Sequence, residues 1–205
     1  LLGSLSEAQK RSLEACQHAV NRLTMTLEDI VEMLKISEGH LQLRLSRFDL
    51  VEVVRQAVAD LAPFVERRSQ LGRLELPADG CLLEADAKKI HLVLVNLLQN
   101  AIKFTPDAGQ ITIRVKREQE KVFIEIEDNG IGIEATELER IFEKFYSNQD
   151  PDFHSSGTYQ FMARGAGLGL SIVKSYVESH NGRIWAESGG KGCGSLFKIA
   201  LNCSV

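Results

Sequence analysis

The chain has 205 residues, of which 44% are hydrophobic and 25% are charged, so its composition is that of an ordinary globular protein. A net charge of -4 argues against a nucleic-acid-binding surface, and we expect no nucleic-acid partner. The four cysteines show neither a CxxC pair nor metal-ligand spacing to a histidine, which predicts reduced thiols in a cytoplasmic protein. No apolar run is long enough to span a bilayer and no signal peptide is evident, so any membrane segment is expected outside this chain.

The first predicted element is a long helix over residues 5–36, which ends near Gly39. Its apolar residues alternate spacings of three and four, which is the a/d seam of a heptad pattern. A stripe this narrow is stable in water only when another helix covers it. We therefore expect either a homodimer through this helix or a partner helix from outside the sequence. The seam consists of Leu13, Cys16, Val20, Leu23, Leu27, Ile30 and Leu34.

The pattern changes at residue 41, where LQLRLSRF alternates apolar and polar residues and predicts a strand over residues 41–48. We therefore divide the chain into a helical region, residues 1–40, and a second domain, residues 41–205. Asp49 is expected to begin the first helix of that domain, and Pro63 is expected to kink or end it.

Strands and helices alternate through the remainder of the chain. Asp86 is placed to cap an apolar helix within residues 90–106. Phe123, Trp185 and Phe197 lie in predicted strands and are expected in the core. The order of elements predicts an α+β fold in which helices cover one face of a sheet. The predicted strands are residues 74–76, 81–85, 111–116, 122–127, 183–187 and 195–201.

The helix within residues 90–106 carries polar side chains opposite its apolar face. Asn96, Asn100 and Lys103 follow at i, i+4 and i+7 and so share one side of the helix. Amide oxygens and an ammonium group suit a hydrated Mg²⁺ with a polyphosphate, because Mg²⁺ prefers oxygen ligands and shares its coordination shell with phosphates. The same three residues also fit the solvent-facing side of an amphipathic helix, and this motif alone leaves both interpretations open.

Two further segments carry glycines at positions where a ligand can approach the backbone. Asp128 ends a predicted strand before a turn with Gly130 and Gly132, and its carboxylate can accept a hydrogen bond from an amine such as that of adenine. DNG is also an ordinary turn sequence. The segment GAGLGL, residues 165–170, opens a helix and leaves backbone N–H groups for phosphate oxygens. It is neither a Walker motif nor a dinucleotide fingerprint.

In order and spacing, NLLQNAIKFTP, EDNGIGI, IFEKFY and GAGLGLSIVK resemble the N, G1, F and G2 boxes of sensor histidine kinases. The resemblance covers nearly the whole chain, because residues 6–49 are similar to the second helix of the dimerisation and phosphotransfer domain and its linker. It implies a Bergerat-type ATP-binding fold, which is a two-layer α/β sandwich whose mixed sheet is covered by helices on one face. The implied cofactors are ATP and Mg²⁺, and the implied partner is the receiver domain of a response regulator.

The resemblance also implies a role for each matching residue. Asn100 would bind Mg²⁺ with Asn96 nearby, and Lys103 would meet the phosphates, so Asn100 and Lys103 carry the catalytic assignment. Asp128 would hold the adenine amine. The adenine pocket would be shaped by Gly130 and Gly132.

A flexible ATP lid is implied between the F and G2 boxes. The predicted lid, residues 147–164, is longer than is common in the family and contains three aromatic residues, so its closed geometry does not transfer from the family. The hinge and phosphate contacts fall to Gly165, Gly167, Leu168 and Gly169, and further nucleotide contacts at the ends of the lid to Lys144, Tyr146 and Arg164.

The helix that carries the phosphoacceptor histidine in this family has no counterpart in the sequence. His18 is the only histidine on the long helix, outside the seam, and it is followed by AVN rather than by an acidic residue and a proline. We expect His18 to be a solvated helix residue. This fragment is therefore not expected to phosphorylate itself.

The leading function is that of the catalytic region of an ATP-dependent protein-histidine kinase, located in the cytoplasm or in the cytoplasmic part of a membrane-bound sensor. ATP-hydrolysing relatives such as gyrase and MutL place a glutamate one turn before the metal-binding asparagine, where this chain has Asn96, and a carboxamide cannot act as a general base. The other alternative is a module that binds nucleotide and dimerises without catalysis. The presence of Asn100, Asp128 and the lid glycines argues against it.

Overall fold

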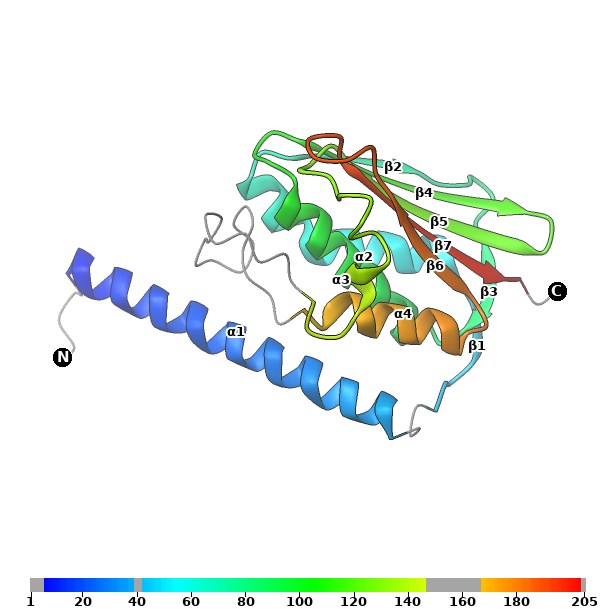
Figure 1. The fold of residues 1–205 in the computed structure, drawn as a ribbon, viewed down its shortest axis with the longest axis horizontal. Helices are drawn as coiled ribbons and strands as arrows, with labels where there is room; N and C mark the ends of the chain where they lie inside the picture. Colours follow the sequence, from blue (N-terminus) through cyan, green and yellow to red (C-terminus); the bar gives the residue numbers. More distant parts are fainter. Residues whose placement is uncertain (1–5, 39–41, 147–166, 204–205) are drawn as a thin grey trace.

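The computed structural model describes residues 6–38, 42–146 and 167–203, and Figure 1 shows helices lying against one face of a sheet. This arrangement confirms the predicted α+β sandwich. The helices are α1 (Glu7–Ser37), α2 (Leu50–Arg67), α3 (Ala87–Phe104) and α4 (Gly169–Ser179), with a short 3-10 helix, η1 (Arg140–Phe142). The strands are β1 (Ser46–Asp49), β2 (Leu71–Glu75), β3 (Leu82–Ala85), β4 (Gln110–Glu118), β5 (Lys121–Asp128), β6 (Arg183–Glu187) and β7 (Ser195–Asn202).

The main sheet has the order β2-β4-β5-β7-β6, and β2 runs parallel to β4 while the other neighbours are antiparallel, so the sheet is mixed. Both predicted strand pairs, β4 with β5 and β6 with β7, are confirmed. The prediction of a strand over residues 41–48 is wrong in extent, because β1 is limited to Ser46–Asp49. Its partner β3 has only four residues, and they pair one to one with those of β1.

The core lies between the sheet and the helices. Along β5 the buried side chains alternate with more exposed ones, so Val122, Ile124 and Ile126 face the helices. Phe197 is buried as predicted, but Phe123 and Trp185 are only half-buried, because they occupy the alternate positions that face away from the helices. Helix α2 continues through Pro63 to Arg67 because buried residues such as Val54, Ala57 and Leu61 hold it on the core.

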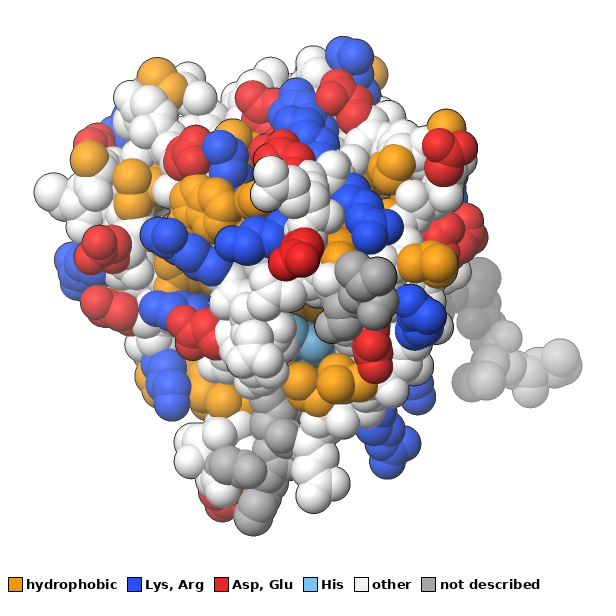
Figure 2. Space-filling view, turned by 90° about the vertical axis from the view of Figure 1, so that its right-hand side faces the viewer, with side chains coloured by type: hydrophobic (Ala, Val, Ile, Leu, Met, Phe, Trp, Pro, Cys, Tyr) orange, Lys and Arg blue, Asp and Glu red, His pale blue; other side chains and the backbone are white. Residues whose placement is uncertain are grey.

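The face of the sheet that points away from the helices carries ion pairs between neighbouring strands. Arg114 Nε lies 2.8 Å from a carboxylate oxygen of Glu75, and Arg114 Nη1 lies 2.5 Å from one of Glu127. On the side of the molecule drawn in Figure 2, acidic and basic side chains are interspersed rather than separated.

Helix α1 begins with a capping box, in which the Ser6 side chain accepts from Gln9 N and the Gln9 side chain accepts from Ser6 N. It ends at Ser37, while the predicted terminator Gly39 lies outside the described residues. All the residues of the apolar seam are exposed. Among its leucine, isoleucine and valine side chains the exposed fraction ranges from 40% at Ile30 to 70% at Leu23. In the single chain the predicted seam is therefore uncovered.

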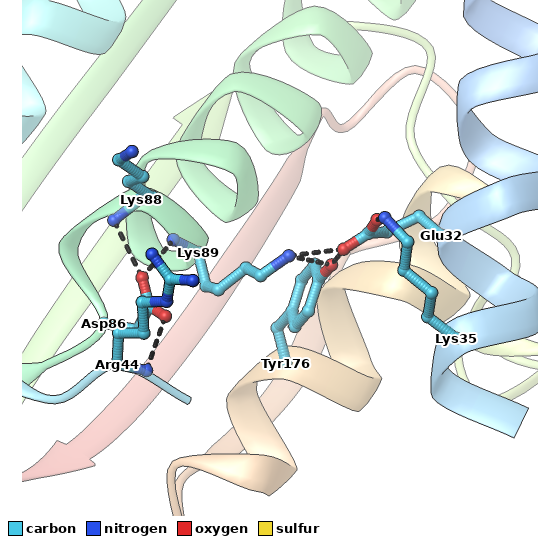
Figure 3. Close-up of polar contacts among 7 residues, drawn as sticks. All are labelled: Glu32, Lys35, Arg44, Asp86, Lys88, Lys89 and Tyr176. Carbon is cyan, nitrogen blue, oxygen red and sulfur yellow. Dashed lines mark hydrogen bonds and ion pairs between the residues drawn. The ribbon is translucent and has the colours of Figure 1, made fainter. Parts of the chain in front are cut away.

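The C-terminal half of α1 is attached to the domain through Glu32 (Figure 3). The Glu32 carboxylate accepts hydrogen bonds from Lys89 Nζ on α3 and from the Tyr176 hydroxyl on α4. Lys89 Nζ also donates to Tyr176 Oη at 2.8 Å, and Lys35 Nζ lies 3.1 Å from the second carboxylate oxygen. Burial disfavours the charged carboxylate, but the hydrogen bonds from the two lysines outweigh it and lower the pKa of Glu32. Met33, the next residue, is 7% exposed and belongs to the core.

Among residues 6–38, 42–146 and 167–203, no helix combines the length and apolar character needed to cross a membrane. All four cysteines are free thiols, as predicted; Cys81 and Cys203 are buried, whereas Cys16 and Cys193 are exposed.

Candidate functional site

Helix α3 carries the predicted metal and phosphate ligands. Asp86 caps it as predicted, since its Oδ1 accepts from the backbone N of Lys88 at 3.1 Å and of Lys89 at 3.2 Å. The apolar side of α3 is buried, which fixes the rotation of the helix about its axis. As a result Asn96, Asn100 and Lys103 all emerge as half-buried side chains, so a fully solvated polar face does not describe them.

Lys103 is held in an environment that disfavours its charge. Burial lowers the pKa of Lys103 to about 8, and its Nζ lies 4.6 Å from the ring centroid of Phe104. A phosphate group brought to this ammonium would stabilise the charged form, because an opposite charge at short range has the reverse effect of burial. The position therefore suits an anionic ligand.

Asp128 ends β5 as a buried carboxylate, 6% exposed. Its Oδ1 accepts from Gly130 N at 2.8 Å and its Oδ2 accepts from Ser195 Oγ at 2.5 Å. Burial raises the pKa of Asp128, while these hydrogen bonds favour the ionised form. Each carboxylate oxygen has a further lone pair, so the group retains acceptor capacity for a ligand amine. Sequence reasoning missed Ser195, which lies directly opposite Asp128 in the register of β5 and β7.

The turn after Asp128 is attached to the end of α3. Ile131 N donates to Phe104 O at 3.1 Å, and a Cβ added to Gly130 would lie 2.3 Å from that same carbonyl oxygen. Only glycine permits this approach. The structure therefore brings Asp128 and the C-terminal turn of α3, with Lys103, to the same region.

Gly132 lies against the loop between β6 and β7 and not against α3. Its φ of 73° is in the left-handed region, and an added Cβ would lie 2.0 Å from Gly190 O in the loop between β6 and β7. Gly192 N donates to Ile131 O at 2.6 Å, which ties this loop to the turn. Gly132 is thus required for packing of the loop behind the Asp128 turn.

The start of α4 meets α3 at Asn96. A Cβ added to Gly169 would lie 2.7 Å from Asn96 Oδ1, while Asn96 Nδ2 donates to Leu92 O at 3.0 Å. Leu168 is 1% exposed, so its side chain is part of the core, and its carbonyl accepts from Ser171 Oγ at 2.8 Å. The first and third predicted motifs are therefore adjacent.

The two ends of the predicted lid lie side by side. Phe145 N donates to Gly167 O at 2.9 Å, and Gly167 has a φ of 70° with Tyr146 O only 2.7 Å from the position of an added Cβ. Tyr146 Oη donates to Glu137 Oε1 at 2.9 Å, so it is engaged within its own segment, and Lys144 is exposed. The predicted lid residues, with Arg164 and Gly165, lie outside the described residues.

A separate hollow of about 340 Å³ lies where the last strands meet the loop between β6 and β7. It is formed by the sheet and this loop and has no lining residue on α3, but it borders the site, because Asp128 and Ser195 both line it. Its lining residues are Glu127, Asp128, Glu187, Ser188, Gly189, Cys193, Gly194, Ser195 and Leu196.

The fold and the grouped motifs define an ATP-binding domain built as a two-layer sandwich. The family described as histidine kinase-, DNA gyrase B- and HSP90-like ATPase matches residues 85–204, which is more than half of the chain, and the chain belongs to this family. Within the family its similarity is to the ATPase catalytic domain of sensor histidine kinases.

The circadian input-output histidine kinase CikA of Synechococcus elongatus is 32% identical over 203 residues, which cover 96% of this chain and 25% of CikA. This chain thus spans about a quarter of that curated relative. The catalytic domain of histidine kinase ThkA is 27% identical with a TM-score of 0.67, covering 78% of this chain and 96% of that one. ThkA solved in complex with the response regulator protein TrrA is similar in fold, with a TM-score of 0.74 at 24% identity over 98% of this chain and 53% of that one.

Proposed function

We propose that the chain is the catalytic region of a sensor histidine kinase and transfers the γ-phosphoryl group of ATP to a histidine on a helix outside this sequence. The observation that carries this proposal is the convergence of three motifs on α3. Asn96 lies beside Gly169 at one end of the row formed by Asn96, Asn100 and Lys103, and the Phe104 carbonyl accepts from the turn that bears Asp128 at the other end. A nucleotide bound along α3 would therefore touch an adenine acceptor, an ammonium and amide oxygens in succession.

The assigned roles follow from the chemistry of these groups. Asp128 accepts a hydrogen bond from the adenine amine, and Lys103 binds the phosphates. The half-buried amide oxygen of Asn100, with Asn96 nearby, fits a Mg²⁺ that shares its shell with waters and phosphates. Bound Mg²⁺ supplies charge neutralisation on the transferring phosphoryl group. Lys144, Tyr146, Arg164 and Gly165 are proposed as further contacts from the ends of the lid.

Transfer is favoured over hydrolysis by the residue at position 96. Hydrolysis in related ATPases needs a base to activate water, and Asn96 is a carboxamide whose Nδ2 donates to Leu92 O and whose Oδ1 lies against Gly169. The site therefore positions a phosphoryl donor without offering a base for water at that point.

The remaining parts of the proposal concern the whole protein. Residues 1–40 would form part of the dimerisation and phosphotransfer domain, and residues 41–205 the catalytic domain. The uncovered seam of α1 supports a homodimer through this helix. A response regulator is the proposed acceptor of the phosphoryl group downstream, as the ThkA complex with TrrA suggests by analogy. The proposed location is the cytoplasm.

Replacing Asp128 tests the adenine assignment. We expect Asp128→Asn to weaken Mg·ATP binding by about 1.5 to 3 kcal/mol, because an amide loses the charge assistance and can present its NH₂ to the adenine amine. Titration calorimetry of the full chain measures this directly. Glu127→Gln is the matched control, since Glu127 is the adjacent residue but pairs with Arg114 on the opposite face of the sheet. Equal ATP affinity for wild type and Asp128→Asn would refute the assignment.

The missing acceptor gives a second test. In-line transfer requires the nucleophile within contact distance of the γ-phosphorus, so the chain alone should bind ATP without acquiring acid-labile label from γ-labelled ATP. A separately supplied acceptor helix should become labelled. Label on this chain that disappears in His18→Ala would show that His18 is an acceptor.

A further inference from the structure

Two buried polar side chains, Arg68 and Gln70, bind the C-terminal end of α3. They are 7% and 6% exposed and lie in the turn between α2 and β2, outside all the sequence motifs discussed above. The Arg68 guanidinium donates to the carbonyl oxygens of Ile102 and Thr105, the second at 2.8 Å. Gln70 Nε2 donates to the same two oxygens at 3.0 and 2.9 Å. Two side chains thus converge on two carbonyls of one helical turn.

These contacts satisfy groups that α3 cannot satisfy itself. The last carbonyls of a helix have no partner within it, and the chain after α3 turns away through Pro106. A guanidinium suits this end because its charge complements the helix dipole and its planar fork reaches several acceptors at once. Arg68 Nε also lies 2.8 Å from Asp107 Oδ1, and Arg68 O accepts from Ala108 N at 3.1 Å. The segment that follows α3 is thereby held against the same turn.

The bound carbonyls belong to the turn of α3 that carries residues of the proposed nucleotide site. Lys103 directly follows Ile102, and Asn100 precedes it by two residues. Between the two carbonyls bound by Arg68 and Gln70, the carbonyl of Phe104 accepts from Ile131 in the turn that carries Asp128. One turn of α3 is therefore bound from two sides, and it is the turn that relates the adenine acceptor to the phosphate-binding groups.

We propose that Arg68 and Gln70 are positioning residues of the nucleotide site, which set the place of Lys103 and Asn100 relative to Asp128. This inference rests on the function proposed above. Without the two side chains the last turn of α3 would lose the hydrogen bonds that hold its Ile102 and Thr105 carbonyls against the turn between α2 and β2. A ligand that touches both Asp128 and the end of α3 would then lose more affinity than a ligand that touches Asp128 alone.

The test compares Mg·ATP with adenosine, because adenosine lacks the phosphates. We expect Gln70→Met to weaken Mg·ATP binding by about tenfold but adenosine binding by no more than about twofold, since small displacements of a positioning group have large effects on the groups they align. Arg68→Lys keeps the charge without the fork and should give the same selective loss. If one variant does not fold, the other is measured in the same way.

Two controls separate positioning from general destabilisation. Asp107→Asn removes the exposed partner of Arg68 and leaves both carbonyl contacts, so the ratio of the two affinities should be that of wild type. A core variant on β7, Leu201→Ala, whose side chain lies beside Gly182 and outside the contacts of Arg68 and Gln70, should also keep that ratio when it is matched to Gln70→Met in thermal unfolding. A wild-type ratio in Gln70→Met and Arg68→Lys would overturn the positioning role and leave the proposed function intact. A wild-type chain that binds neither ligand would overturn both.

Discussion

The surroundings of Lys103 disfavour its positive charge in the free protein, whereas a bound phosphate group would favour that charge. Its ammonium is buried beside an aromatic ring, and the pKa of about 8 means that a sizeable fraction is neutral in mildly alkaline solution. A polyphosphate would reverse this balance by favouring the charged form. Binding of the nucleotide should therefore be coupled to uptake of a proton at Lys103.

The sign of this coupling gives a pH prediction. Below about pH 8 Lys103 is already protonated, so the affinity for Mg·ATP should be nearly constant; above it, the affinity should fall as pH rises. Calorimetry in buffers of different ionisation enthalpy measures the proton uptake, expected above about pH 8 and absent in Lys103→Met. Lys174→Met, on the exposed side of α4, is the control that keeps the uptake. Identical uptake in wild type and Lys103→Met would exclude this role.

At the residue scale, the sequence predicted the site residues that are close to one another in the chain. Asn96, Asn100 and Lys103 share one side of α3 because the helical period places them there. Ser195 was missed because its contact with Asp128 joins residues that are 67 positions apart in the chain. Arg68 and Gln70 were missed for the same reason: the carbonyls they bind belong to another helix.

At the scale of elements, the Glu32 carboxylate joins the C-terminal half of α1 to α3 and α4, next to the buried side chain of Met33. We expect Glu32→Gln to increase hydrogen exchange in the C-terminal half of α1 while β4 and β5 remain protected, because the amide loses the charge-assisted bonds to Lys89 and Tyr176. The cost should be about 1 to 2 kcal/mol, since Glu32 is partly exposed.

The depressed pKa of Glu32 adds a condition to this experiment. A carboxylate whose pKa is lower in the folded state stabilises the fold above its ordinary pKa, and the contribution is lost as pH falls through the folded value. The comparison therefore belongs at neutral pH. Lys35→Ala is the control, because Lys35 reaches the same carboxylate from α1 itself and does not bridge to the domain. Unchanged exchange in Glu32→Gln would mean that Met33 and its neighbours hold α1 without the ion pair.

The elements that the sequence predicted best are those with strict local alternation. Strands β4 and β5 were predicted nearly to their ends because apolar side chains alternate throughout. β1 was predicted too long because its length is set by pairing with the four residues of β3, which are distant in the sequence. Alternation also identifies two faces without saying which one is covered, and so Trp185 was assigned to the core although it lies on the open face.

At the scale of the whole molecule, the uncovered seam of α1 predicts self-association. Replacing Leu23, which is 70% exposed, by lysine should weaken association by about one to two orders of magnitude, because it removes about 1.5 to 3 kcal/mol of apolar burial. Sedimentation over a range of concentrations measures the change. Leu45→Lys, at an exposed leucine outside α1, should associate as wild type does. A wild-type chain that stays monomeric at high concentration with α1 still helical would contradict the prediction.

The hydrogen bond between Phe145 and Gly167 has a consequence for how this domain can vary in length. It fixes Phe145 and Gly167 next to each other, so the separation between the two ends of the intervening sequence is set by the rest of the domain. The entropy of closing a flexible loop grows only with the logarithm of its length, so doubling it costs about 0.6 kcal/mol. Insertions between Phe145 and Gly167 should therefore have little effect on the free energy of unfolding, so the number of residues between these two positions can change without loss of the fold.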